Sequence, residues 1–402
     1  MHAYMAAEIP PPPLPDPQPA SGVKSALSGF LSLTLAVFFA GSALALTNDT
    51  LIVLGGNHSL AGAAAAFGVI ALLMTLAVYG LMGLTPMVPK RFFLPVTLCG
   101  LLTAMAALPL LIYFYKSAAW IVWGMSLAQF MVVSLVIRRL AGSWKPRWPL
   151  ISTEQLGSPG FRWGNLIGFA AVNLLVAVPA VVLYVAGCGV VAVSHFTEDF
   201  VALRPSGVTM QVRTYTRDDG KTVVLVPMSH IGEEEFYRNL AASFPPTATV
   251  LMEGVSDKGN VLDDKVGYGK TAKDLGLAEQ QAVFRPQGEL VPADVDLSQF
   301  SKTSLDYLKK SMAIHTQGIN PVTLPLLLES PPPDLPEKLL HDLLTLRNAH
   351  LLRVMEEKLL TSDHVIVPWG AAHMPGISAG VLKAGFRLQD TEDHVAIRFG
   401  KR

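Results

Sequence analysis

The feature that most constrains this chain is a series of five long segments without a single charged residue. They span residues 26–46, 60–84, 92–115, 117–137 and 164–193. A helix needs about 20 apolar residues to cross the hydrocarbon of a bilayer. These segments are apolar on all sides, whereas a surface helix of a soluble protein has a polar face. The sequence therefore predicts an integral membrane protein with five transmembrane helices in the lipid bilayer.

Composition divides the 402 residues into three parts, because the chain is too long for one ordinary core. Residues 1–25 contain the run "IPPPPLPDPQP" and are predicted to be a disordered, Pro-rich cytoplasmic tail. Residues 26–193 form the predicted membrane region. Residues 194–402 have the mixed charge of a soluble domain.

Net charge and cysteine usage limit the partners. The formal net charge is zero and there is no block of Lys and Arg, so we expect no nucleic-acid partner. The two cysteines, Cys99 and Cys188, both lie in apolar segments. The soluble part therefore has neither a disulfide framework nor a thiolate metal site. The oligomeric state is left open.

The loops between the apolar segments predict the orientation. The first loop has no Lys or Arg, the second has Lys90 and Arg91, and the fourth has five basic residues. Because basic loops stay in the cytoplasm, the N-terminus is predicted to be cytoplasmic. Five spans then place the C-terminal domain outside the cytoplasm, in a periplasmic or extracellular position.

The C-terminal part shows strand and helix patterns in alternation. Two β-rich runs flank the turn at Asp219 and Gly220, and an amphipathic helix follows at 231–244. Apolar strands are predicted at 247–252 and 364–370, a helix after 376, and two short closing strands at the end. This order predicts an α/β (α+β) domain with a central mixed sheet.

Three predicted strands end at residues whose side chains can bind a metal or transfer a proton, namely His230, Glu253 and His373. In open α/β sheets, function gathers at the carboxyl ends of the strands. Two histidines and a glutamate are a ligand set of catalytic zinc sites. A single histidine at a strand end would more often be structural, so the prediction depends on all three together.

A late amphipathic helix, predicted at 335–360, has Arg347 within its apolar stripe and Asn348 beside it. A guanidinium on a core-facing stripe is costly unless an anion meets it. Glu253 or a substrate oxygen could be that anion. The alternative is an arginine that reaches the solvent or pairs with an ordinary structural carboxylate.

Five motifs together resemble the TraB/GumN/Tiki superfamily over most of residues 208–400. They are "VPMSH" (226–230), "LMEG" (251–254), "PADVDLSQFS" (292–301), "LRNAHLLRVM" (346–355) and "VPWGAAHMPGISAGVLKAGF" (367–386). The first of the family's two Gly-x-x-His motifs departs here, because Pro227 stands where the family has Gly. For Asp294 and Asp296 we expect only a turn or capping role.

The resemblance implies a divalent metal ion, with manganese, cobalt or zinc as the possible identities, and a peptidase activity. His230 and His373 would hold the metal, with Glu253 as third ligand or general base. Arg347 and Asn348 would orient Glu253 or stabilise the oxyanion.

Our leading prediction is a membrane-anchored, metal-dependent hydrolase, a peptidase that acts on peptide or amide substrates outside the cytoplasm. The alternative is a non-catalytic, membrane-tethered protein that captures a peptide or a haem-like ligand. A transporter is a third interpretation. It is disfavoured because the predicted spans contain no Asp, Glu, Lys, Arg or His.

Overall fold

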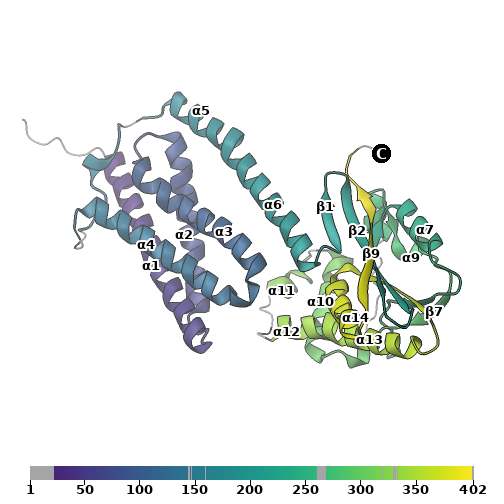
Figure 1. Cartoon of the computed structure of the whole chain (residues 1–402). Coiled ribbons are helices and arrows are strands. Elements are labelled where there is room, and N and C mark those ends of the chain that lie inside the picture. The colour runs from purple at the N-terminus through teal and green to yellow at the C-terminus, as the bar shows by residue number, and fades with distance from the viewer. Residues whose placement is uncertain are drawn as a thin grey trace, which may run out of the picture. The chain divides into compact units, whose positions relative to one another are not determined.

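The structure of the chain is a computed structural model (Figure 1). It describes residues 22–143, 145, 147–158, 160–259, 269–318, 320–328, 332 and 334–400. The chain divides into two compact units, Met1–Cys188 and Gly189–Arg402. Most of the predicted Pro-rich tail lies outside the described residues, and residues 22–25 already belong to the first helix.

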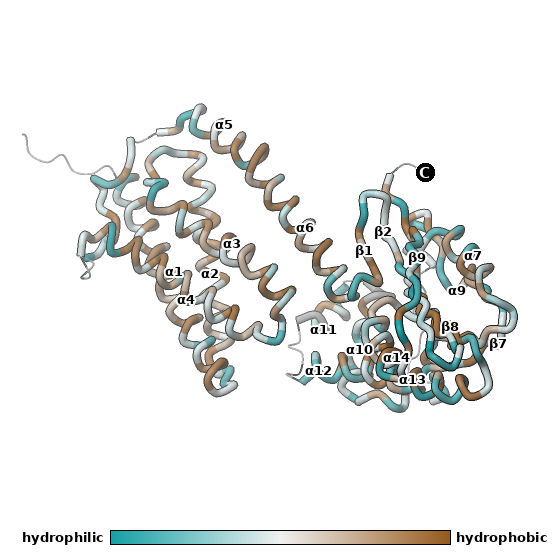
Figure 2. Tube along the Cα trace, in the orientation of Figure 1, coloured by the Kyte–Doolittle hydropathy of each residue, from teal (hydrophilic) through white to brown (hydrophobic). Residues whose placement is uncertain are grey.

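The N-terminal unit consists of long helices. They are α1 (Gly22–Gly55), α2 (Ala61–Leu84), α3 (Lys90–Tyr113), α4 (Ala118–Ala141), and α5 (Trp163–Val172), which continues through the π-helical segment η3 (Asn173–Ala177) into α6 (Val178–Phe196). Short 3-10 turns lie at η1 (Tyr115–Ser117) and η2 (Thr153–Gln155). Five helical stretches are long and apolar enough to cross a membrane, and Figure 2 shows the hydrophobic colour along them. The prediction of five membrane helices is confirmed.

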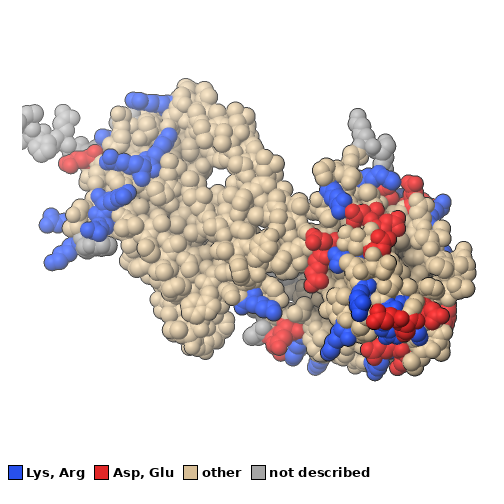
Figure 3. Space-filling model, viewed as in Figure 1, with Lys and Arg blue, Asp and Glu red and all other residues tan. Residues whose placement is uncertain are grey.

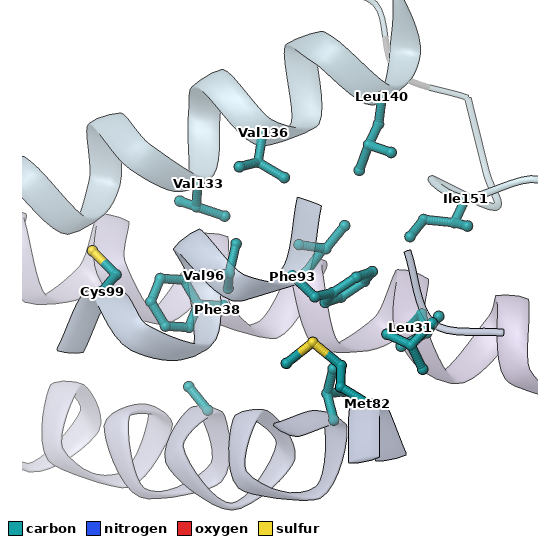
Figure 4. Close-up of a cluster of buried hydrophobic side chains, with 14 of the residues drawn as sticks. Leu31, Phe38, Met82, Phe93, Val96, Cys99, Val133, Val136, Leu140 and Ile151 are labelled. Atoms are coloured by element: carbon teal, nitrogen blue, oxygen red, sulfur yellow. The ribbon is translucent and has the colours of Figure 1, made fainter. Parts of the chain in front are cut away.

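The helices of this unit pack through a cluster of buried aliphatic and aromatic side chains (Figure 4). Leu31 and Phe38 of α1 meet Met82 of α2, Phe93 of α3 and Val133 of α4 in this cluster. Contacts between α1 and α4 and between α1 and α2 are the most extensive. The first helix is therefore the centre of the helical unit.

Helix α1 is longer than the sequence predicted. The predicted span ended at residue 46, because Asn48, Asp49 and Thr50 were interpreted as a loop. The helix instead continues to Gly55. These polar residues bond to α4: Ser126 Oγ donates to Asp49 at 2.6 Å, and Trp123 Nε1 donates to Thr50 at 2.9 Å.

The C-terminal unit contains a seven-stranded sheet. Its strands are β1 (Val201–Arg204), β2 (Gly207–Thr216), β3 (Thr222–Met228), β5 (Thr249–Met252), β7 (Glu289–Pro292), β8 (His364–Gly370) and β9 (Arg387–Arg398). The order along the sheet is β1-β2-β3-β8-β5-β7, and β9 pairs with β2. Two-residue strands β4 (Ile231–Gly232) and β6 (Ala278–Glu279) form a separate pair.

The direction of the strands makes this a mixed sheet, as predicted. Strands β3, β8, β5 and β7 are parallel neighbours. Strands β1, β2 and β9 add an antiparallel edge. Because the four strands of the parallel half run in the same direction, they all end at the same edge of the sheet.

Helices cover both faces of the parallel half. The remaining helical elements are α7 (Glu234–Ala242), α8 (Gly269–Asp274), α9 (Gln280–Val283), η4 (Leu297–Gln299), α10 (Lys302–Gln317), α11 (Leu324–Leu328), α12 (Leu335–Leu340), the π-helical η5 (His341–Leu346), α13 (Arg347–Lys358), η6 (Ala371–His373) and α14 (Met374–Lys383). Side chains alternate along β8: Val365, Val367 and Trp369 pack with α13 and α14, whereas Ile366 packs with α7 and α9. The unit is a three-layer α/β/α structure.

One prediction at the end of the chain was wrong. The sequence suggested two short closing strands, but β9 is a single strand of 12 residues. Its pairing with β2 shifts register twice, between Val208 and Thr209 and between Thr214 and Tyr215. Such bulges keep one long strand paired while they break the simple alternation of residues that sequence analysis relies on.

Candidate functional site

Three parallel strands deliver polar side chains to one edge of the sheet. Glu253 directly follows β5, Asp294 lies two residues after β7, and His373 ends the turn η6 that follows β8. The strands are adjacent in the order β8-β5-β7. Their carboxyl ends therefore bring the three side chains together, as expected for an open α/β sheet.

Arg347, the first residue of α13, links these side chains. Its Nε and Nη2 donate to the two oxygens of Asp294 at 2.9 and 2.6 Å, and Nη2 also donates to Glu253 Oε1 at 2.8 Å. Its Nη1 lies 3.1 Å from His373 Nε2 and 3.5 Å from the carbonyl oxygen of Leu343. All five N–H groups of the guanidinium thus have an acceptor.

The cluster is mostly buried. The side chain of Asp294 is 1% exposed, that of His373 5%, that of Arg347 11% and that of Glu253 16%. Burial of charges is costly unless they are paired and hydrogen-bonded. The bidentate contact with Asp294 and the contact with Glu253 meet that condition, and they raise the pKa of Arg347 although burial alone lowers it.

The contacts of His373 specify one tautomer. Arg347 Nη1 is only a donor, so His373 Nε2 must accept and the proton of the neutral ring lies on Nδ1. Nδ1 then donates to Asn348 Oδ1 at 2.7 Å, and Asn348 Nδ2 lies 3.4 Å from the backbone oxygen of His373. Asn348 therefore contacts both the ring and the backbone of His373.

Burial and the neighbouring Arg347 charge lower the pKa of His373 to about 4. Glu253 and Asp294 act in the opposite direction but do not outweigh these effects. The imidazole is therefore neutral at physiological pH. With one negative charge each on Glu253 and Asp294 and one positive charge on Arg347, the cluster has a formal charge of −1.

Glu253 is the most exposed of the charged side chains in the cluster. Its Oε1 accepts from Arg347, and its Oε2 accepts from the backbone N–H of Gly370 at 2.5 Å. A side chain at position 370 would approach Oε2, since an added Cβ would lie 3.3 Å from it. A side chain in place of this glycine of "PWGAAH" would therefore be tight against the carboxylate, which would have to shift by a few tenths of an ångström.

The helix that carries Arg347 and Asn348 is positioned by two further small residues. An added Cβ at Gly376 would lie 2.5 Å from Asn348 Nδ2, and one at Gly380 would lie 2.3 Å from Leu352 Cδ1. These glycines allow α13 and α14 to approach closely. The π-helical segment η5 directly precedes Arg347, and such segments are frequent at functional sites.

The structure brings four of the five predicted site residues together, namely Glu253, Arg347, Asn348 and His373. His230 lies beyond the end of β3 in an exposed position, where its carbonyl oxygen accepts from Gln280 N–H at 2.9 Å. Pro227 is buried within β3, where the fixed φ of proline is compatible with an extended backbone. In the part of the chain that the structure describes, no three His, Cys, Asp or Glu side chains are grouped as a metal site.

Asp294 is the residue of the cluster that sequence reasoning missed, because we expected only a turn or capping role for it. It does accept from the backbone N–H groups of Gly254 and Val295, at 3.0 and 2.8 Å. Its main contact, however, is with Arg347. Asp294 does follow a short apolar run, but this run includes Pro292 and is too short to indicate a strand. Asp296 has the expected capping role, because it accepts from Ser298 N–H.

Comparisons with protein-family models, with curated proteins and with solved structures each find no match to the chain. The function of the chain must therefore be inferred from the geometry and chemistry of the residues in the site.

Proposed function

We propose that the chain is a membrane-anchored hydrolase that cleaves peptide or related amide bonds at the carboxyl edge of its sheet. The observation that carries the proposal is the arrangement of Glu253. Its carboxylate is fixed by one charged and one backbone donor, and it is the charged group of the cluster with most access to solvent. Perturbed, mutually oriented titratable groups at a strand edge are typical of active sites.

In this proposal Glu253 is the general base. It takes a proton from a water molecule, whose oxygen attacks the carbonyl carbon of the substrate. The carbon–nitrogen bond then breaks, and the same proton passes from Glu253 to the departing nitrogen. Arg347 acts as a positioning residue rather than an oxyanion donor, because its five N–H groups already have acceptors within the protein.

Asn348 and Asp294 act behind these residues. Asn348 keeps His373 in the tautomer that accepts from Arg347. Asp294 holds the other side of the guanidinium. Together these contacts fix the orientation of the Glu253 carboxylate.

The described arrangement does not fit the divalent metal ion that the resemblance to TraB/GumN/Tiki proteins implies. Glu253 Oε1 and His373 Nε2 are 3.6 Å apart, a separation that two ligands of one ion could have. The guanidinium of Arg347, however, contacts both atoms from the side where such an ion would bind. His230 is not grouped with them. The proposed chemistry therefore uses only the protein's own side chains.

The orientation of the chain is part of the proposal. Figure 3 shows that Lys and Arg gather at the end of the helical unit where α1 begins. The last turn of α4 carries two of them, Arg138 and Arg139. The positive-inside bias supports a cytoplasmic position for this end. With five crossings, the site would face the periplasmic or extracellular side.

The proposal is tested with the full-length chain in lipid nanodiscs and a library of unrelated peptides, with product detection by mass spectrometry. We expect cleavage at defined bonds, with equal rates before and after treatment with a chelator. Absence of cleavage for every peptide would contradict the hydrolase. Loss of cleavage with chelator, and recovery with Mn²⁺, Co²⁺ or Zn²⁺, would show that Arg347 moves to admit an ion.

One observation favours a second candidate function, a non-catalytic protein that captures a peptide or haem-like ligand. The polar groups of the cluster largely satisfy one another, which leaves few of them to take part in a reaction. Stoichiometric binding of a peptide from the same library without turnover would support this alternative.

A further inference from the structure

A carboxylate is buried in the helical unit, far along the sequence from the site described above. Asp49 of α1 is 9% exposed. Asn48 Nδ2 donates to its Oδ1 at 3.1 Å, and Ser126 Oγ of α4 donates to its Oδ2 at 2.6 Å. Among the described residues no Lys, Arg or His forms an ion pair with Asp49.

The position of this carboxylate makes its lack of a cationic partner significant. Ser126 is the ninth residue of α4, which places it roughly 12 Å along that helix at a rise of about 1.5 Å per residue. Asp49 is therefore beside a membrane-crossing helix and not in an aqueous loop. A charged group there is costly without a counterion, and such groups commonly mark ion sites.

A second, independent observation points to a missing partner. Asn48 is 6% exposed, and its Oδ1 has no hydrogen-bond partner although it is fully buried. Its amide nitrogen is directed at Asp49, so the free oxygen cannot be exchanged for the nitrogen without loss of that bond. A buried acceptor without a donor is rare in proteins and costs free energy.

The hydroxyl of Ser126 differs from several other hydroxyls in the apolar helices of the unit. Ser42, Thr75 and Ser134 each donate to a carbonyl oxygen of their own helix, three or four residues back. That is the usual arrangement for these residues in apolar helices. Ser126 instead donates to a residue on another helix, and its lone pairs stay available beside Asp49.

From these contacts we infer that Asp49, Asn48 and Ser126 form a binding site for a small monovalent metal cation such as Na⁺. The carboxylate supplies the negative charge, and the Asn48 and Ser126 oxygens supply neutral ligands. All the donors are oxygens, which hard cations prefer. The cation would neutralise Asp49 and satisfy the unpartnered oxygen at once. This site is independent of the proposed hydrolase.

The test uses the full-length protein in detergent and compares thermal unfolding in NaCl with that in choline chloride at equal ionic strength. We expect Na⁺ to raise the unfolding midpoint by about 4 °C at saturation, because a ligand that binds only the folded state stabilises it. Binding of ²²Na⁺ should reach one ion per chain.

Asp49→Asn should abolish both the midpoint shift and ²²Na⁺ binding, and Ser126→Ala should weaken both. The matched control is Ser134→Ala, which removes a hydroxyl from the same helix and should leave both unchanged. Equal stability in Na⁺ and choline, with no bound ²²Na⁺, would overturn the inference and show that Asp49 is an uncharged structural acid. If Asp49→Asn does not fold, an unchanged Na⁺ response of Ser126→Ala would contradict it.

Discussion

Arg347 shows how strongly single residues determine this site. Its guanidinium joins three elements of the sheet edge, through Asp294 after β7, Glu253 after β5 and His373 after β8. The sequence predicted that an arginine on an apolar stripe needs an anion, and Glu253 and a substrate oxygen were the two candidates. The structure adds a second carboxylate. The planar fork of arginine matches a carboxylate with two parallel bonds, which lysine cannot do.

Asp294→Asn tests the contribution of the buried pair. The change removes the charge opposite Arg347 and leaves the guanidinium partly uncompensated, so we expect a loss of about 3 kcal/mol or more in the free energy of unfolding. Denaturant unfolding of the full-length chain in detergent would measure it. The matched control is Asp218→Asn, which removes an exposed partner of Arg387 and should change stability little. Equal effects of the two substitutions would contradict the assigned role of Asp294.

His373 should make stability depend on pH. Its pKa is about 4 in the folded state against an ordinary value of 6.5, so the unfolded chain binds the proton more readily. The contribution of His373 to stability is therefore constant above pH 6.5, falls as the pH drops from 6.5 to 4, and changes no further below 4. The total loss is at most about 3 kcal/mol.

Unfolding measured between pH 7 and 4 for the native chain and for His373→Asn checks this dependence. The variant should lose most of the slope in this interval. Asp219 and Asp342, whose pKa values are lowered to about 2, begin to act only near pH 3.8 and below. The same slope in both proteins would show that His373 is not the group responsible.

The small residues of "GAAHMPGISAG" (370–380) lie just before and within helix α14, where other parts of the chain approach closely. Small residues of this kind can let a ligand approach the backbone. The structure assigns them instead to contacts within the protein: Gly370 to Glu253, Gly376 to Asn348 and Gly380 to Leu352. Sequence patterns could identify the glycines as important but could not identify what approaches them, because that depends on which helix packs there.

Gly376→Ala tests this close packing. The new methyl group would meet Asn348 Nδ2 at 2.5 Å and displace the side chain that holds His373. We expect a net loss of about 1–2 kcal/mol, since the clash outweighs the gain in helix propensity. Gly124→Ala in α4, where nothing lies within 4 Å of the added atom, is the control; with the propensity gain and no clash, it should not destabilise the chain. Unfolding measurements on both variants compare them, and a neutral Gly376→Ala would contradict the close contact.

Helices and strands with a strong hydrophobic pattern could be predicted from the sequence, and those without such a pattern could not. The five membrane helices follow from composition alone, and β3, β5 and β8 follow from apolar runs. Strand β7 was missed because it has four residues, ends in Pro292 and is largely exposed. The role of Asp294 was missed with it, since a residue at a strand end cannot be recognised when the strand is not. The extension of α1 to Gly55 was missed because it depends on hydrogen bonds to α4.

For the whole molecule, the proposed orientation predicts which residues can be reached from outside an intact cell. Single cysteines in a background without Cys99 and Cys188 would be labelled with a membrane-impermeant maleimide. Asp218→Cys, in the exposed turn of the C-terminal unit, should react in intact cells. Ser143→Cys, in the basic loop after α4, should react only after permeabilisation. The reverse pattern would place the site in the cytoplasm.

Replacement of Glu253 determines whether this carboxylate performs hydrolysis at the edge of the sheet. Turnover of a cleaved peptide would be measured for Glu253→Gln and for Glu289→Gln, the same change on a glutamate at the start of β7, outside the cluster. Loss of the general base should lower kcat by roughly 10²–10⁴-fold in Glu253→Gln, and Glu289→Gln should match the native chain. Undiminished turnover in a folded Glu253→Gln variant would contradict the claim.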